Sequence, residues 1–282
     1  MKIKSLLVSN FRGYDREVKV GFKDLSVLVG KNDIGKSTLL EALDCFFNEG
    51  KGCVKIDRDD INKQRASSGE FEIMIAIEFE DLPESIVIDA TNSTTLRGEH
   101  LLTTDGTLLV VKRFPNAGKE RVFIRANHPT APICKDLLQK KKEQLQRLLD
   151  ENAIQCSNRN KNAEMRAAIW GSQSDLQEQT IEIEISKIDA KAIWEQIKKY
   201  MPHFSLFQSD RKNSDGDNEV QDPMKYAIKE ILDDSDIRTK LDDVAEKVKE
   251  RLGEVSARTL EKLREMNPDV ASSLNPKIPE PA

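Results

Sequence analysis

The feature that most constrains the fold is a nine-residue run, Gly30-Lys31-Asn32-Asp33-Ile34-Gly35-Lys36-Ser37-Thr38, set between two apolar patterns. Before it, residues 25–29 read Leu-Ser-Val-Leu-Val and predict a strand that enters the loop. After it, apolar residues recur at threes and fours and predict a helix over 37–47, namely Leu39, Leu40, Leu43, Phe46 and Phe47. Strand, glycine-rich loop and helix are the context in which GxxxxGK[ST] binds phosphate.

Each position in this loop has a chemical reason. The two glycines allow successive backbone N–H groups to face the phosphates, and the start of the helix adds a partial positive charge. Lys36 can reach the β- and γ-phosphates, and the Ser37 hydroxyl can ligate Mg²⁺. The sequence therefore predicts a nucleoside triphosphate site formed by seven residues: Gly30, Asn32, Asp33, Gly35, Lys36, Ser37 and Thr38. The alternative is an ordinary glycine turn.

The remaining pattern divides into an antiparallel β layer and helices. Residues 3–8 form a short apolar run, and residues 71–79 alternate in a way that predicts a strand with one mostly buried face. Further strands are expected near 86–89, 107–114 and 120–125, so the β layer spans about 70–126. Helices are expected over about 134–201, and a brief strand over 204–207. Asp89 and Glu78 end apolar runs as a magnesium-side acid would, but both runs are interpreted as structural strands.

The last pattern is a long amphipathic helix. Apolar or small positions recur at threes and fours from Ile237 to Met266, and charges fill the other faces. Such a helix suits an arm or a coiled-coil limb, or else a surface helix packed on its own domain. The expected division is a nucleotide-binding lobe over 1–222, a helical arm over 223–267 and a proline-rich tail over 268–282.

Composition argues against a membrane-spanning protein and against a zinc site at the cysteines. The net charge is −5, no apolar stretch approaches the length needed to cross a bilayer, and the four cysteines form no zinc-ligand spacing. The expected location is therefore the cytoplasm, without membrane partners. Local basic residues remain open to two interpretations, a groove for a phosphate backbone or a solvated surface: Lys112, Arg113, Arg121, Arg125 and Lys140-Lys141-Lys142.

Residues 1–48 resemble the RecF/SMC/OLD branch of ABC-type ATPases, where OLD denotes the overcoming-lysogenization-defect nucleases. The likeness lies in residues 3–13 with the turn Asn10-Phe11-Arg12-Gly13, and in the loop from Gly30 to Thr38. Weaker likeness covers 70–126 and 200–225, including the stretch from Phe204 to Arg211. The fold class implied is α/β, an ABC-type P-loop ATPase lobe with an antiparallel β layer and a helical arm.

The resemblance also implies roles for residues. Lys36 and Gln208 would act in catalysis, Ser37 and Gln208 would hold Mg²⁺, and Arg12 would lie beside the ATP. The expected assembly is a homodimer or a higher homo-oligomer, and DNA is the expected partner of the full-length protein. Residues after 39 contain neither a signature motif nor a strand ending in Asp-Glu, and no Toprim acid cluster. An N-terminal piece of a longer protein is therefore expected.

Three functions follow from this resemblance. The first is the ATPase module of an OLD-like nuclease acting on DNA, in phage defence, with ATP-driven dimer closure controlling DNA access or cleavage. The second is a RecF/SMC-like DNA clamp without nuclease chemistry. The third is a nucleotide-binding subunit that needs a partner for turnover.

Overall fold

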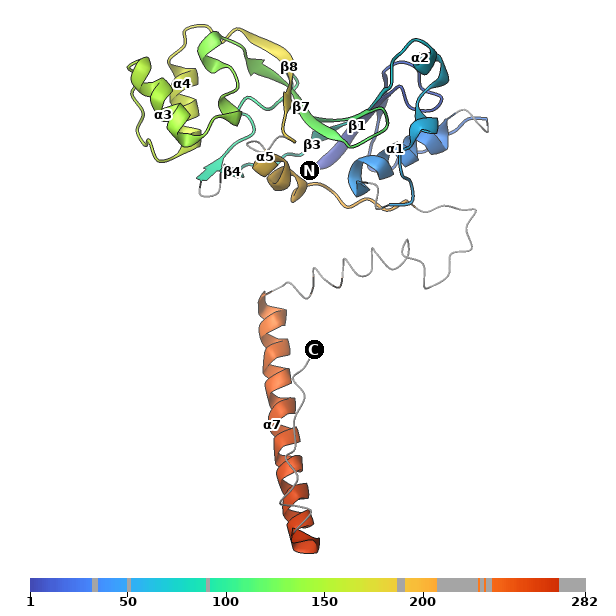
Figure 1. The fold of residues 1–282 in the computed structure, drawn as a ribbon, viewed down its shortest axis with the longest axis vertical. Helices are drawn as coiled ribbons and strands as arrows, with labels where there is room; N and C mark the ends of the chain where they lie inside the picture. The colour runs from blue at the N-terminus through green and yellow to red at the C-terminus, as the bar shows by residue number, and fades with distance from the viewer. Residues whose placement is uncertain are drawn as a thin grey trace. The chain divides into compact units, whose positions relative to one another are not determined.

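The computed structural model describes residues 1–31, 35–49, 52–89, 92–186, 191–206, 228, 231 and 235–268. Contacts divide the chain into two units, residues 1–206 and residues 207–282 (Figure 1). Within the described residues, no helix is long and apolar enough to cross a membrane. The first unit contains the sheets and the short helices, and the second contains one long helix.

The first unit is built on a six-stranded antiparallel sheet in the order β2-β1-β3-β6-β7-β8. The fold class is therefore α/β with an antiparallel layer, as the sequence predicts. The strand bounds are β1 (Lys2–Ser9), β2 (Val18–Gly21), β3 (Glu72–Glu80), β6 (Leu108–Pro115), β7 (Arg121–Pro129) and β8 (Glu178–Glu184). A separate two-stranded sheet pairs β4 (Ile86–Asp89) with β5 (Asn92–Thr94). Asp89 therefore ends a strand outside the main sheet.

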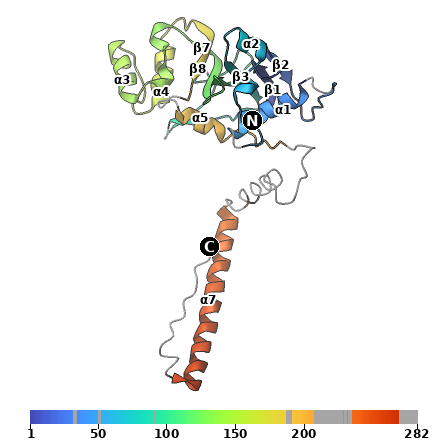
Figure 2. The ribbon, with the colours of Figure 1, turned by 45° about the vertical axis from the view of Figure 1, so that its right-hand side comes forward.

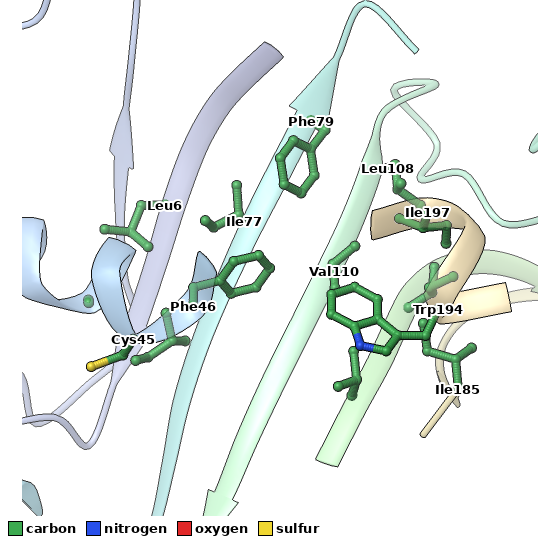
Figure 3. Packing of buried hydrophobic residues seen from close by; sticks show 14 of the residues in the cluster. Leu6, Cys45, Phe46, Ile77, Phe79, Leu108, Val110, Ile185, Trp194 and Ile197 are labelled. Carbon is green, nitrogen blue, oxygen red and sulfur yellow. The ribbon is translucent and has the colours of Figure 1, made fainter. Parts of the chain in front are cut away.

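Helix α1 (Lys36–Asn48) and helix α5 (Lys191–Lys198) bury apolar side chains in one cluster on one face of this sheet. Figure 3 shows Phe46 of α1 and Trp194 of α5 over β3 and β6, near Phe79 and Val110. Phe46 is 1% exposed and Trp194 is 5% exposed. Both helices pack against the Val, Ile and Phe side chains of this face. The helix predicted after the loop is confirmed as α1.

The two helices α3 (Lys142–Glu151) and α4 (Asn162–Gly171) lie together at the β7–β8 end of the sheet (Figure 2). They share a core of their own, which includes Leu145, Leu149, Met165 and Ile169. Glu99 and Arg166 form a fully buried ion pair beside this core, with Nε–Oε2 at 2.7 Å and Nη2–Oε1 at 2.8 Å. The short helix α2 (Lys63–Ser67) and three 3₁₀ turns complete the unit: Arg58–Asp60, Pro132–Cys134 and Leu137–Gln139.

The predicted half-exposed strand over 71–79 is wrong in one respect, because β3 is buried on both faces. All seven residues between its two ends are buried, including Glu78 at 3% exposure. Ile73, Ile75 and Ile77 on one face pack in the main cluster beneath α1 and α5. The opposite face of β3 packs in a second, smaller cluster, which includes Leu7, Met74 and Val111.

Two predicted strands do not form. Residues 25–29 are not in a strand, and Leu25, Val27 and Val29 are 83%, 72% and 89% exposed. Among the described residues, this run pairs with no strand of either sheet, and β1 is bonded to β2 on one side and to β3 on the other. Residues 204–206 are likewise not in a strand; Phe207 lies outside the described residues. Phe204 instead stacks on Phe47, with ring centroids 5.7 Å apart.

The second unit is described mainly by α7 (Ser235–Met266), a single helix of 32 residues. It covers the region in which the sequence predicts the last amphipathic helix. Its apolar side chains remain largely exposed within this unit, with Val244 at 57% and Val255 at 60%.

Candidate nucleotide-binding site

The start of α1 is shaped by Gly35. Its backbone has φ 95° and ψ 12°, in the left-handed region that glycine adopts without strain. A Cβ at this position would lie 2.9 Å from the Tyr14 hydroxyl oxygen. The N-cap residue is this glycine, so within the described ranges no side-chain capping bond reaches the first backbone N–H groups of α1. Such a helix start is suited to bind an anion.

The Lys36 ammonium folds back over the loop. Its Nζ donates to the Gly30 carbonyl oxygen at 2.7 Å and to the Lys31 carbonyl oxygen at 2.5 Å. No carboxylate holds this ammonium among the described residues. The structure therefore brings the Lys36 ammonium, at the start of α1, to the carbonyls of Gly30 and Lys31, and both of these acceptors are neutral. A phosphate oxygen would offer this cation a charged acceptor, which forms a stronger hydrogen bond.

Tyr14 supports the same loop from the turn that follows β1. Its hydroxyl donates to the Gly35 carbonyl oxygen at 3.1 Å, and burial raises the pKa of this phenol. The same carbonyl oxygen accepts the Leu39 N–H at 3.3 Å, which closes the first turn of α1. The sequence interpretation missed Tyr14. The only available signal was its place directly after the Asn-Phe-Arg-Gly turn.

Arg12 lies in this turn too, with φ 49°. Its Nε donates to Asp60 Oδ1 at 2.7 Å, and its Nη1 pairs with the Glu41 carboxylate on α1. Asp60 and Asn62 also hold the Arg12 backbone, through Arg12 N to Asp60 O at 2.6 Å and Asn62 Nδ2 to Arg12 O at 2.7 Å. Arg12 is therefore fixed against the helix that follows the loop, one turn beyond Ser37.

The far end of α1 is fixed by buried charge. Glu49 follows the helix, and its carboxylate lies 3.5 Å from the Lys112 Nζ and 3.2 Å from the Lys198 Nζ. These two ammonium groups and the burial of Glu49 have opposing effects on its pKa, and the net result is a lowered value. The Lys112 side chain is fully buried, pairs with Glu120 at 2.8 Å, and lies 5.2 Å from the ring centroids of both Phe46 and Trp194.

Other predicted site residues are placed as follows. Ser37 is exposed on the first turn of α1 and Thr38 is partly buried beside it. Asn32, Asp33 and Gln208 lie outside the described residues. Glu78, considered as an acid at the end of an apolar run, is engaged by Ser5, Thr107, Lys4 and Lys19. Among the described residues, no group of three or more His, Cys, Asp or Glu could hold a metal ion.

The basic residues of β6 and β7 do not line an open groove. Lys112 is buried on the face that carries α1, and the arginines lie on the opposite face. Arg113 and Arg125 share Glu182, with N–O distances of 2.8 and 3.0 Å, and Arg121 pairs with Glu184 at 2.8 Å. These side chains are already neutralised across the strands. Lys140, Lys141 and Lys142 stand apart from them, around the start of α3.

Comparison with known proteins gives one family and several more distant likenesses. A family model described as an AAA ATPase domain matches residues 1–280. The achromobactin transport ATP-binding protein CbrD of Dickeya dadantii (strain 3937) is 36% identical over 64 residues, which cover 23% of this chain and 24% of CbrD. The chain thus matches about a quarter of that relative's length.

Three solved structures are similar at low identity. The SMC head domain from Thermotoga maritima shows 15% identity and a TM-score of 0.28, covering 53% of this chain and 51% of that one. The SMC head bound to the C-terminal winged-helix domain of ScpA shows 16% identity and 0.31, covering 54% and 51%. An SMC ATPase studied for ATP-driven dimerization and DNA-stimulated activation shows 15% identity and a TM-score of 0.31, covering 54% of this chain and 99% of that one.

Proposed function

Because the chain belongs to the AAA ATPase domain family, we propose that it binds Mg·ATP at the start of α1. The observation that carries this proposal is the arrangement of Lys36, whose ammonium reaches back to two loop carbonyls beside an uncapped helix start. Lys36 would bind the β- and γ-phosphates, and the Ser37 hydroxyl would ligate Mg²⁺. The bound Mg²⁺ supplies charge stabilisation to the transferring phosphoryl group.

The remaining predicted residues complete this proposal. Gly30, Asn32, Asp33, Gly35 and Thr38 would surround the phosphates, and Gln208 would help to hold Mg²⁺ and the attacking water. Arg12 would lie beside the nucleotide. Its contacts with Glu41 and Asp60 mean that a phosphate would have to compete with two carboxylates for the guanidinium. Because Gln208 would act on the attacking water, Gln208→Ala is expected to slow hydrolysis more than it weakens ATP binding.

The test is calorimetric titration of Mg·ATP into the wild-type chain and into Lys36→Ala. Loss of a charge-assisted contact is expected to weaken binding by about tenfold or more. Lys119→Ala, which removes an exposed lysine from the β6–β7 turn, is the matched control and should bind as the wild type does. Unchanged affinity in Lys36→Ala, with the far-ultraviolet circular dichroism also unchanged, would overturn the assignment of the loop.

We propose further that ATP drives dimer closure and that closure controls DNA processing, as the ATPase module of an OLD-like nuclease of phage defence. The resemblance of residues 1–48 to the RecF/SMC/OLD branch supports this proposal. On this view the chain binds ATP but hydrolyses it slowly, since the signature motif must come from another lobe. Brisk hydrolysis by the chain alone that is lost in Lys36→Ala would contradict this view.

A DNA clamp without nuclease chemistry is the second candidate, and the long amphipathic helix α7 favours it. A subunit that needs a partner for turnover is the third. Incubation of the protein with linear and nicked DNA, Mg²⁺ and ATP separates these three candidates. Cleavage supports the nuclease, ATP-dependent retention on DNA without cleavage supports the clamp, and neither supports the partner-dependent subunit.

A further inference from the structure

Arg166 and Trp170 of α4 join the α3–α4 pair to the rest of the first unit. Arg166 forms its fully buried ion pair with Glu99, which lies in the loop between β5 and β6. One turn further along α4, the Trp170 ring packs against His100 of the same loop and against His128 of β7, with ring centroids 4.9 and 6.1 Å apart. A histidine can change charge between about pH 5 and 8. The contact of α4 with the sheet therefore contains groups that titrate near neutral pH.

The two histidines of this contact have different surroundings. The His100 Nδ1 lies 3.2 Å from the Glu178 carboxylate of β8, so a proton on this ring is matched by an acid. His128 is 4% exposed, and its Nδ1 lies 2.9 Å from the His100 carbonyl oxygen. Because a carbonyl oxygen only accepts, this Nδ1 carries the hydrogen, and Nε2 is the atom that would take up a proton. Among the described residues, no carboxylate forms a hydrogen bond or an ion pair with His128.

The elements packed against His128 also bear charged or titratable groups: Glu99 and His100 of the loop, Arg166 of α4 and Glu178 of β8. Both oxygens of Glu99 are bonded to Arg166, and those of Glu178 to His100 and Asn127. Burial and the neighbouring His100 ring lower the pKa of His128, and the two glutamates and the His100 carbonyl offset this only in part. The closed contact therefore favours the neutral form of His128.

We propose that His128 is a proton-sensitive latch, at which protonation favours separation of Trp170 and α4 from β7 while the six-stranded sheet stays folded. An imidazolium that is buried without a carboxylate is unfavourable, and opening of the contact returns it to water. The Trp170 Nε1 is buried without a hydrogen-bond partner among the described residues, so no hydrogen bond of the indole opposes this separation. Trp170 belongs to the core that α3 and α4 share, so the two helices are expected to move together.

The ion pair of Glu99 and Arg166 opposes the opening, because separation would break it. The open form is therefore a minor population, of the kind that hydrogen exchange measures. The latch rests on the contact of α4 with the sheet and is independent of nucleotide binding.

Hydrogen exchange of the full chain at pH 7.5 and 6.0, corrected for the intrinsic effect of pH on exchange, tests the latch. An exposed histidine with a pKa of about 6.5 is protonated to about three-quarters at pH 6.0, which favours the open form by up to about fourfold. Amides of α4 are expected to lose about threefold to fourfold in protection between the two pH values. They are also expected to exchange faster than the amides of β3 at both, since the opening is local.

His128→Asn is the decisive variant. Its side-chain amide can still donate to the His100 carbonyl oxygen but does not titrate, so the loss of α4 protection at pH 6.0 is expected to disappear. His203→Asn, at an exposed histidine, is the matched control and should keep the loss. An equal loss in His128→Asn and in the wild type overturns the proposal, and so does equal protection of α4 and β3, which would show that only global unfolding exposes α4.

Nuclear magnetic resonance gives a measurement that does not depend on the folding of His128→Asn. The chain has three histidines, so the imidazole signals of the wild type can be assigned with His100→Asn and His203→Asn. The His128 signal is expected to titrate below about pH 6.5, the ordinary value for an exposed histidine. Titration of His128 at or above this value would overturn the latch.

Discussion

The Tyr14 hydroxyl and the Leu39 N–H share one acceptor, the Gly35 carbonyl oxygen, at 3.1 and 3.3 Å. The turn after β1 is thereby joined to the first hydrogen bond of the helix that follows the phosphate-binding loop. Tyr14 fixes the orientation of the Gly35–Lys36 peptide, and through it the direction of the first N–H groups of α1.

Replacement of Tyr14 by Phe is expected to weaken Mg·ATP binding by about threefold to tenfold. The change removes one hydrogen bond worth about 0.5–1.5 kcal/mol and leaves the ring in place. Calorimetric titration measures the affinity, and Tyr200→Phe, at a residue 40% exposed, is the control. If Tyr14→Phe binds ATP as the wild type does, the hydroxyl has no positioning role.

The buried pair of Glu99 and Arg166 predicts a large effect on stability. Each side chain is 1% exposed, so Arg166→Met leaves a carboxylate buried without its cation. The free energy of unfolding is expected to fall by about 3–5 kcal/mol, measured by urea denaturation. The double variant Glu99→Gln with Arg166→Met should recover part of this loss. A loss in the double variant equal to the sum of the losses in the two single variants would contradict a direct pairing.

Glu78 predicts a dependence of stability on pH. Burial alone would raise its pKa, but hydrogen bonds from Lys19, Ser5, Thr107 and Lys4 lower it to about 2. A folded-state pKa below that of the unfolded chain stabilises the fold at higher pH, and this contribution is lost as the pH falls from about 5 towards 2. Denaturation at a series of pH values should therefore show a shallower acid loss in Glu78→Gln than in the wild type. An identical slope in both proteins would exclude this role.

Because residues 25–29 are exposed, we expect them to contribute much less to the free energy of unfolding than the residues of β3 do. Val27→Ser is expected to change the free energy of unfolding by no more than about 0.5 kcal/mol, because Val27 is 72% exposed. Ile75→Ser, at a fully buried position of β3, is the contrast and should destabilise by several times that amount. Hydrogen exchange should show fast amides at 25–29 and slow amides in β3; slow exchange at both would indicate that 25–29 is paired.

Local apolar pattern was sufficient to predict several of the elements. The helix after the loop, the strands at 3–8 and 107–114, and the long last helix follow from apolar spacing alone. β8 was missed because its sequence Glu-Gln-Thr-Ile-Glu-Ile-Glu is mostly polar, although Ile181 and Ile183 alternate with two glutamates. These glutamates, Glu182 and Glu184, pair with Arg113, Arg121 and Arg125 on other strands. The run at 25–29 has a strand-like composition, but it pairs with no strand of the described sheets, and apolar spacing alone does not show whether a strand finds a neighbour.

The residues of the candidate site also fall into two groups, those that the local sequence predicts and those that depend on distant contacts. Lys36 and the two glycines are evident from the loop motif, since their roles depend on local backbone. Tyr14 and the environment of Lys112 depend on contacts made across long stretches of sequence. Nothing around Lys112 in the sequence distinguishes a buried cation from an exposed one, because the rings of Phe46 and Trp194 that enclose it come from α1 and α5.

Helix α1 has a mechanical consequence for any change at the loop. It is a rod of 13 residues, about 20 Å long, held at its N-cap by Tyr14, at its second turn by Arg12 and at its C-terminal end by the cations on Glu49. A rigid rod cannot absorb an axial displacement within itself. Movement of Lys36 and Ser37 towards a ligand would therefore be transmitted to the Lys112 ammonium between Phe46 and Trp194, at the opposite end of the helix.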